Sequence, residues 1–238
     1  MIVKKIFSFL LLSVLTGSFV SSQTKSGIVQ YSVSQIENKT SNNSDVLDRT
    51  YQRLNDLQYV LKFDSTRSIY SLKKLLSINN DEIYVKMASS IAGRGEYYTD
   101  LRNKERIRYI NFRGDEFLIN YPFEKLAWNI TNEVKKIKGF SCRKATLILG
   151  KSLIRTKPID VTAWFTDDIP YGYGPKLFFG LPGLIMELEE GNLRFTVSNI
   201  DLNENVKIEP QSNGIQLSEL EFNEFIIKKS KEMGFIRG

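Results

Sequence analysis

The chain has 238 residues, of which 33 are basic and 27 acidic, and it contains no histidine and a single cysteine. These numbers exclude Ser-His-Asp and Cys-His catalytic arrangements, His-ligated zinc or copper sites and an intramolecular disulfide. The net charge of +6 is a mild excess that gives no argument for nucleic acid. Carboxylate chemistry, Lys or Tyr bases and oxygen-ligated cations are not excluded by these numbers. No residue pattern marks such a site, so we predict no catalytic residue, no metal site, no cofactor and no nucleic-acid partner. We expect Cys142 to be a buried, inert thiol.

The N-terminal segment has the order of a secretory signal. Lys4 and Lys5 precede an apolar stretch from Ile6 to Val20, and small residues follow before Gln23. The stretch is shorter than the roughly 20 residues that a membrane-spanning helix needs. The pattern predicts a signal peptide over residues 1–22, and hence an exported protein, periplasmic or secreted, that has no transmembrane anchor and is soluble after cleavage.

The remaining residues, 23–238, predict a single β-rich domain. Alternation of apolar and polar residues, together with turn signals, predicts short strands. The segments 45–54 and 75–92 fit either a helix or an irregular excursion. Ser218 and Glu221 form a capping-box pattern, which predicts a C-terminal helix ending near Gly234. The main strands are expected at residues 27–36, 57–63, 67–72, 106–110, 116–120, 127–131, 133–137, 140–149, 159–166, 184–189 and 193–197. The predicted fold class is mainly β (β-rich α+β), a curved antiparallel sheet or partial barrel with a C-terminal helix.

Two groups of basic residues stand out. Arg102, Lys104, Arg106 and Arg108 fall at every second position, which predicts a cationic stripe on one strand face. A second group, Lys135, Lys136, Lys138, Arg143 and Lys144, lies on the next predicted hairpin. Both groups fit a solvated face that discourages edge-to-edge aggregation, or a contact for anionic lipid head groups.

Residues 164–187 differ from the rest of the chain because they concentrate proline, glycine and aromatic residues. Proline fixes backbone angles and glycine permits unusual ones, so the composition predicts a shaped loop. Leu181-Pro182-Gly183-Leu184 has the sequence of a type II turn with a positive φ at Gly183. The candidate ligand- or partner-binding residues are Trp164, Asp168, Pro170, Pro175, Phe178, Phe179, Gly180, Leu181, Pro182, Gly183, Leu184 and Ile185.

The motif Gly-Leu-Pro-Gly-Leu-Ile at residues 180–185 resembles the signature of the GLPGLI family of exported proteins, which is common in the Bacteroidota. The resemblance is specific from about Tyr97 to Val197. It also includes Ala163-Trp164-Phe165-Thr166, Ile169-Pro170, Gly174-Pro175 and residues 139–145. It implies export and fold but no established activity. Residues 151–158 depart from the family, since this connection is longer and more basic than usual.

Two interpretations of the 180–185 turn remain open. It is either a rigid corner that places aromatic residues in the core, or a docking loop or lid over an apolar cavity; Trp164, Phe178 and Phe179 are accordingly core residues or ligand contacts. Asp167 and Asp168 lack the spacing of a calcium loop. Asp168 and Glu187 are the nominal carboxylate pair of a hydrolase, but no sequence feature brings them together.

The sequence therefore predicts a non-enzymatic cell-envelope protein that binds or carries a lipid or other apolar ligand in the concavity of its sheet. Such a shape is similar to the half-barrels that carry lipoproteins through the periplasm. The alternative is an accessory or chaperone-like module that binds another envelope protein and fills the concavity with its own side chains. A carboxylate-based hydrolase is the third class. Peripheral contact with an anionic membrane surface fits the first two.

Overall fold

The computed structural model describes residues 26–36, 45–73, 82–202 and 205–234. The predicted signal peptide and the residues linking β1 to α1 and β3 to α2 lie outside these ranges. The described elements, in chain order, are β1 (Gly27–Gln35), α1 (Asp45–Gln52), the 3₁₀ turn η1 (Arg53–Asp56), β2 (Gln58–Phe63), β3 (Arg67–Leu72), α2 (Glu82–Ala92), β4 (Glu96–Asp100), β5 (Glu105–Phe112), β6 (Asp115–Asn120), β7 (Asn129–Ile137), β8 (Phe140–Leu149), β9 (Ile159–Thr166), β10 (Leu184–Glu190), β11 (Leu193–Leu202), β12 (Ile215–Ser218) and α3 (Glu219–Glu232).

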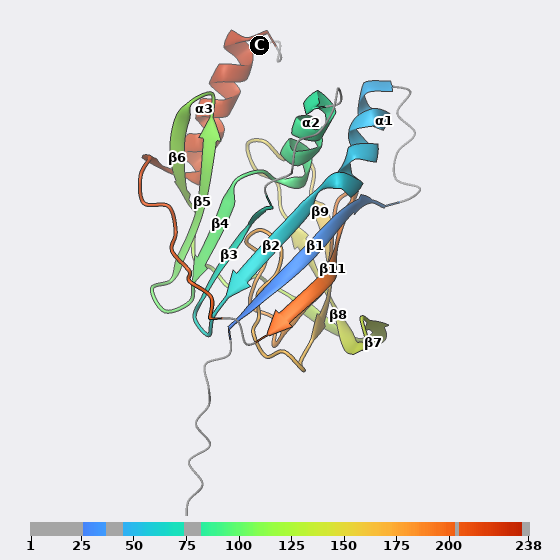
Figure 1. Ribbon diagram of the computed structural model, residues 1–238. Coiled ribbons are helices and arrows are strands. Elements are labelled where there is room, and N and C mark those ends of the chain that lie inside the picture. Colours follow the sequence, from blue (N-terminus) through green and yellow to red (C-terminus); the bar gives the residue numbers. More distant parts are fainter. Residues whose placement is uncertain (1–25, 37–44, 74–81, 203–204, 235–238) are drawn as a thin grey trace, which may run out of the picture.

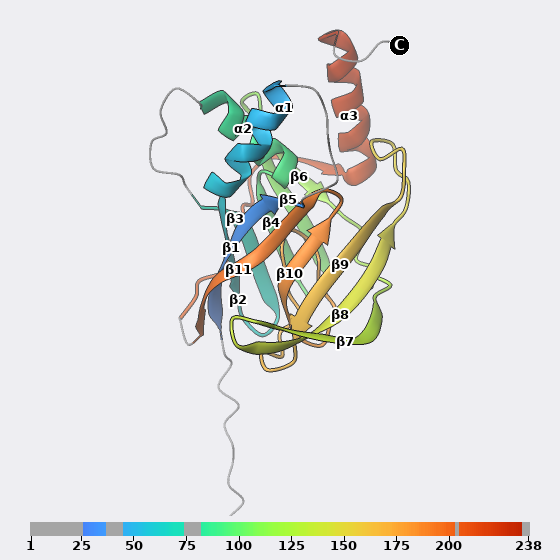
Figure 2. The same cartoon turned by 90° about the vertical axis from the view of Figure 1, so that its right-hand side faces the viewer.

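All strands of the described residues belong to one sheet, in the order β12-β6-β5-β4-β3-β2-β1-β11-β10-β9-β8-β7. Neighbouring strands are antiparallel, except that β12 runs parallel to β6. Two runs of hairpins, β2 to β6 and β7 to β11, meet at β1, which pairs with both β2 and β11. The sheet is strongly curved and remains open between its edge strands (Figures 1 and 2). The prediction of a curved, mainly antiparallel sheet is confirmed.

The alternation in the sequence explains which face of the sheet is buried. Val29, Tyr31 and Val33 of β1 are at most 1% exposed, whereas Gln30 and Ser32 between them point to the other face. The same pattern continues in β2, where Tyr59, Leu61 and Phe63 are fully buried. The inner, concave face therefore carries a continuous apolar core, with which side chains from β8, β9 and β11 also pack.

Helices occupy one end of the sheet (Figures 1 and 2). The two ambiguous segments contain helices, because Leu54 of η1 and Val85 and Ala88 of α2 bury their apolar sides in the main core. α3 begins at the predicted capping box, in which the Glu221 amide donates to Ser218 Oγ at 3.2 Å and the Ser218 amide to Glu221 Oε2 at 2.7 Å. None of the described helices is long and apolar enough to cross a membrane.

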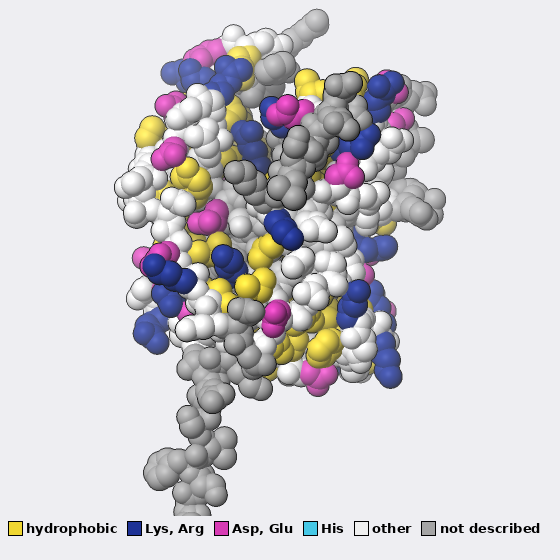
Figure 3. Space-filling view, viewed as in Figure 1, with side chains coloured by type: hydrophobic (Ala, Val, Ile, Leu, Met, Phe, Trp, Pro, Cys, Tyr) yellow, Lys and Arg dark blue, Asp and Glu magenta, His cyan; other side chains and the backbone are white. Residues whose placement is uncertain are grey.

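The first predicted cationic stripe is wrong. β5 begins at Glu105, so Arg102 and Lys104 lie in the preceding turn, where they are exposed. Arg106 and Arg108 share the inner face of β5, and their guanidinium groups lie 5.3 Å from the Phe179 ring centroid and 5.1 Å from that of Tyr97. The outer face drawn in Figure 3 carries basic and acidic side chains interspersed, with no continuous basic stripe.

The second basic group does lie on the β7–β8 hairpin, but three of its five cations, Lys135, Arg143 and Lys144, are paired with acids. Lys144 Nζ lies 2.9 Å from a Glu133 carboxylate oxygen, and the Arg143 guanidinium lies 2.8 Å from Asp167. Lys138 is in the turn of the hairpin, with a φ of 52°. Opposite charges on neighbouring strands neutralise much of the local field, so this surface is a mixed one.

Candidate functional site

The segment between β9 and β10, residues 167–183, folds back on itself and fills the concave face. The Gly180 amide donates to the Gly172 carbonyl oxygen at 2.9 Å, and the Leu184 amide donates to that of Ile169 at 2.9 Å. Tyr173 and Phe179 form a further antiparallel bridge. These bonds place the two arms of the segment side by side. We call residues 167–183 the plug loop.

The plug loop buries its large apolar side chains. Ile169, Phe178, Phe179 and Leu181 are each less than 9% exposed. Leu184 and Ile185, which open β10, are fully buried. The architectural interpretation of the Gly180–Ile185 motif therefore fits the structure: its side chains are part of the core.

The turn geometry predicted for Leu181–Leu184 is wrong. Gly183 does not have a positive φ, and the Leu184 amide bonds to Ile169 rather than closing a turn on Leu181. Glycine is required at position 183 for another reason. A Cβ atom there would lie 1.8 Å from the Thr166 carbonyl oxygen, so only a residue without a side chain allows the two backbone segments to approach.

Residues from near both edges of the sheet, Arg106 on β5 and Trp128 directly before β7, hold the plug loop. The Arg106 guanidinium on β5 donates to the Leu177 carbonyl oxygen at 3.3 Å and to that of Pro122 at 2.8 Å. Trp128 donates through Nε1 to the Phe179 carbonyl oxygen at 2.9 Å. Burial lowers the pKa of Arg106, although a guanidinium remains protonated at any physiological pH. The charged guanidinium of Arg106 thus donates to two backbone oxygens, that of Leu177 in the plug loop and that of Pro122 in the segment after β6.

An ion pair between the plug loop and β10 also holds the loop in place. Lys176, at a φ of 55°, forms an ion pair with Glu190 at the end of β10. The two side chains are only 15% and 20% exposed, and the ammonium group lies 5.0 Å from the Phe195 ring centroid. Attraction between charges is stronger in such a setting than at an exposed surface, although the desolvation of both groups opposes it.

A cluster of tyrosines lies on the inner face next to this ion pair. Tyr59 and Tyr70 stack with ring centroids 5.0 Å apart and an interplanar angle of 2°. Tyr31 donates its hydroxyl to the Ile185 carbonyl oxygen at 2.7 Å. The hydroxyls of Tyr59, Tyr70 and Tyr173 have no hydrogen-bond partner among the described residues. Burial raises the pKa of all four phenols, so they are neutral at physiological pH and cannot serve as bases.

Trp164 is not brought together with the plug loop aromatics. It lies on the outer face of β9, between the inward-facing Ala163 and Phe165. The Lys135 ammonium lies 4.3 Å from the Trp164 ring centroid and 2.6 Å from Glu187 Oε1. Glu187 is only 9% exposed, and its ion pair with Lys135 compensates for the cost of burying a carboxylate.

The exposed candidates line the rim of the plug loop. Asp168, Pro170, Gly180 and Pro182 are exposed, whereas Pro175 is buried. The bond from the Leu184 amide to Ile169 ties the two arms of the loop together, so exposed residues occur on two neighbouring segments. We call Asp168, Pro170, Gly180 and Pro182 the loop rim.

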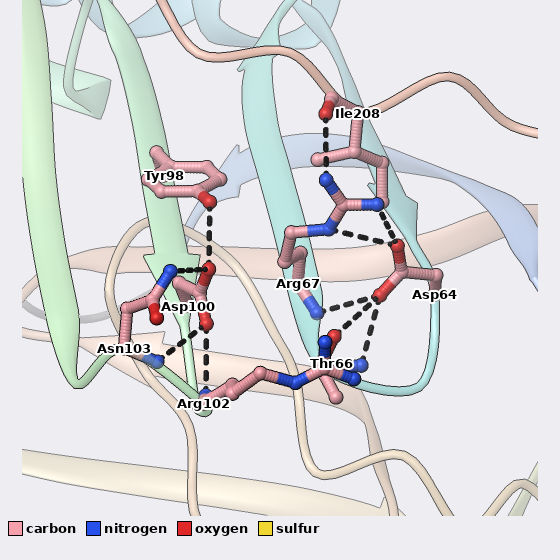
Figure 4. Close-up of polar contacts among 8 residues, drawn as sticks. All are labelled: Asp64, Thr66, Arg67, Tyr98, Asp100, Arg102, Asn103 and Ile208. Atoms are coloured by element: carbon pink, nitrogen blue, oxygen red, sulfur yellow. Dashed lines mark hydrogen bonds and ion pairs between the residues drawn. The ribbon is translucent and has the colours of Figure 1, made fainter.

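Two carboxylates that the sequence did not single out lie at adjacent hairpin turns (Figure 4). Asp64, after β2, accepts from the amides of Thr66 at 2.8 Å and Arg67 at 2.7 Å, and it also binds the Arg67 guanidinium. Burial alone would raise the pKa of Asp64, but these hydrogen bonds outweigh it and the pKa lies below its usual value. The Arg67 guanidinium also reaches the Ile208 carbonyl oxygen at 3.4 Å.

Asp100, at the end of β4, has a comparable set of donors. It accepts from the amides of Arg102 at 2.8 Å and Asn103 at 2.9 Å, from Asn103 Nδ2 at 3.0 Å and from the Tyr98 hydroxyl at 3.0 Å. Both carboxylates are thus occupied by their own turns. They fix the loops at this end of the sheet and are not poised for acid–base chemistry.

The remaining carboxylates and the cysteine that could support chemistry do not form a reactive site either. Asp168 and Glu187 both influence the Cys142 thiol electrostatically but lie in different surroundings, since Asp168 is exposed on the loop rim and Glu187 is buried and binds Lys135. Across the described part of the chain, no three acidic or cysteine side chains converge as ligands for a metal ion. Cys142 is fully buried, and burial raises the pKa of its thiol to about 11.

Comparison with known proteins adds to the fold. The model of a family of proteins of unknown function, Porph_ging, matches residues 150–187. This stretch includes the connection between β8 and β9, β9 itself, the plug loop and the start of β10, and it is too short to show membership. No curated protein matches the chain.

Solved structures show a related fold. Two structures of PNGF-II, in different space groups, match with a TM-score of 0.55 and identities of 15% and 13%. Each match covers 86% of this chain but only 34% or 33% of PNGF-II, so the chain spans about a third of that protein. At this identity the likeness concerns the fold alone. An outer membrane lipoprotein-sorting protein domain from Vibrio parahaemolyticus matches with a TM-score of 0.25 and 9% identity, which is too low to support an argument.

Proposed function

We propose that the chain is an exported, non-catalytic protein of the cell envelope that binds another envelope protein through the loop rim. The observation that carries this proposal is the plug loop, whose side chains occupy the concave face where a carrier would hold its ligand. An apolar carrier needs an open cavity, and here Phe178, Phe179 and Leu181 are at most 7% exposed. An apolar ligand would therefore have to displace the loop. This favours the interaction module over the carrier.

The loop rim has the properties of a docking surface. Pro170 and Pro182 are exposed on a backbone that is held from both sides of the sheet. Proline has a fixed φ, so a partner that binds here orders little additional chain. The acidic side chain of Asp168 next to these prolines adds a polar contact, which suits a reversible protein–protein interface.

Support for a non-catalytic role comes from the state of the ionisable groups. Asp64 and Asp100 are occupied by turn amides, Glu187 by Lys135 and Glu190 by Lys176. Catalytic acids and bases need a group that can exchange protons with a substrate. The carboxylates of the described core are instead engaged in contacts that fix the structure.

Site-specific photo-cross-linking tests this proposal. A photoreactive amino acid at position 168 or 182, in cells that produce the protein, should give a discrete adduct with another protein. The same residue in place of Ile83, which is 63% exposed on α2, serves as the matched control away from the rim. Equal or absent adducts at the rim and control positions would overturn the proposal.

A further inference from the structure

The connection between β8 and β9 projects beyond the sheet. The last pair of the two strands is Leu149 with Ile159, and residues 150–158 extend past it. The Ser152 amide donates to the Arg155 carbonyl oxygen at 2.9 Å, and the Arg155 amide donates to Ser152 Oγ at 3.1 Å. These bonds close a tight turn whose two central residues are Leu153 and Ile154. We call residues 150–158 the β8–β9 tip.

The tip exposes branched aliphatic side chains to solvent. Leu153 is 49% exposed and Ile154 60%, and Ile148, which precedes the tip on β8, is 70% exposed. Isolated exposed aliphatic residues are common on protein surfaces, but adjacent ones at the end of a projecting turn form a convex apolar point. Such a point cannot be covered by the protein's own sheet, from which it projects.

Positive charge surrounds this apolar point. Residues 150–158 include Lys151, Arg155 and Lys157 and no acidic residue. None of these three cations forms an ion pair with another residue in the described ranges. They differ in this respect from Lys135, Lys144 and Lys176, each of which is paired with a glutamate.

We propose that the β8–β9 tip binds the surface of a membrane that contains anionic lipids. Leu153 and Ile154 enter the boundary between head groups and acyl chains, and the three cations contact the lipid phosphates. Apolar area and attraction to anionic lipids both contribute to interfacial binding. A membrane surface is the occupant that fits a convex tip, because it offers negative charge and apolar depth together.

The position of the tip agrees with the function proposed for the loop rim. β9 runs from the tip, at Ile159, to the plug loop, which begins after Thr166. Its eight residues separate the two sites by roughly 25 Å at about 3.3 Å per residue. Binding through the tip would therefore keep the loop rim at a distance from the bilayer, although the membrane proposal does not depend on the protein partner.

Vesicle sedimentation tests the tip directly. The chain from Gln23 onward, which includes every described residue, is mixed with vesicles of phosphatidylcholine alone or mixed with phosphatidylglycerol. The variants are Leu153→Ser with Ile154→Ser, which removes the apolar point, and Lys151→Gln with Lys157→Gln, which removes charge. Ile83→Ser on α2 is the control for an exposed isoleucine elsewhere, and thermal unfolding verifies that each variant is folded.

We expect the parent protein and Ile83→Ser to bind the anionic vesicles and not those of phosphatidylcholine. Each double variant should weaken this partitioning by about tenfold. Added salt should weaken parent binding, and it should have a smaller effect on the charge variant. The proposal is overturned if the parent protein does not prefer anionic vesicles, or if folded tip variants bind as the parent does.

Discussion

The backbone at Gly183 passes so close to the Thr166 carbonyl oxygen that a methyl group has no room. Replacing Gly183 with alanine should therefore destabilise the fold by about 2 kcal/mol, since the strand end or the plug loop must shift. Gly150→Ala is the matched control, because a Cβ atom there meets no neighbour within 4 Å. Urea unfolding of both variants measures the difference. Equal stability of the two variants would contradict the close approach.

The Asp64 carboxylate is expected to make the stability of the fold depend on pH. Its pKa in the folded protein lies below the usual value, so folding favours the deprotonated form. The resulting stabilisation is present above the unfolded pKa of about 3.9 and is lost as pH falls through the folded value. Asp64→Asn should lower the free energy of unfolding at neutral pH and make its acid dependence shallower.

Urea unfolding at a series of pH values between about 6 and 2.5 measures this change in slope. Asp167→Asn is the control, since the Asp167 carboxylate pairs with Arg143 at an exposed position. It should keep the acid dependence of the parent. An Asp64→Asn variant with the same pH profile as the parent would show that the turn hydrogen bonds do not stabilise the carboxylate.

At the scale of elements, Arg106 links β5 to the plug loop through the Leu177 carbonyl oxygen and the Phe179 ring. Arg106→Met keeps much of the apolar stem but removes the charged donor. We expect amide exchange of Gly180, whose N–H bonds to Gly172 within the loop, to accelerate by about tenfold or more.

Arg102→Met is the matched control for this exchange experiment, because Arg102 lies in the exposed turn before β5. It should leave loop exchange unchanged. Fast exchange of the Gly180 amide already in the parent protein, or an unchanged rate in Arg106→Met, would mean that the plug loop does not depend on this tether.

Elements whose contacts are local could be predicted from the sequence. The hairpin of β2 and β3, the turn at Glu190–Asn192 and the capping box of Ser218 all depend on residues close in the chain. β12 was missed because it is four residues long and mostly exposed, and because it pairs with the distant β6. Its position depends on tertiary contacts, which alternation does not record.

In the candidate site, too, local features could be predicted from the sequence and features that depend on distant contacts could not. Its composition correctly located a shaped loop, since proline and glycine constrain the backbone locally. The role of Gly183, the inward direction of Arg106 and the outward direction of Trp164 depend on partners far along the chain. Asp64 and Asp100 come together only through the pairing of β3 with β4. No spacing in the sequence predicts these contacts.

At the scale of the whole molecule, Cys142 reports on opening of the core. It is fully buried, and burial raises the pKa of its thiol to about 11. A thiol reagent at mildly alkaline pH should therefore label the native protein very slowly and the unfolded protein at the rate of a free thiol. Labelling in urea should follow global unfolding. Rapid labelling without urea would contradict a closed core.

The side chains of the plug loop, rather than a bound ligand, occupy the concave face of the sheet. This can be tested by native mass spectrometry of the protein purified from the cells that produce it, before and after extraction with organic solvent. We expect the same mass in both samples, that of the polypeptide alone. A lipid or other apolar compound that accompanies the protein and is lost on extraction would contradict it, and would restore the carrier hypothesis.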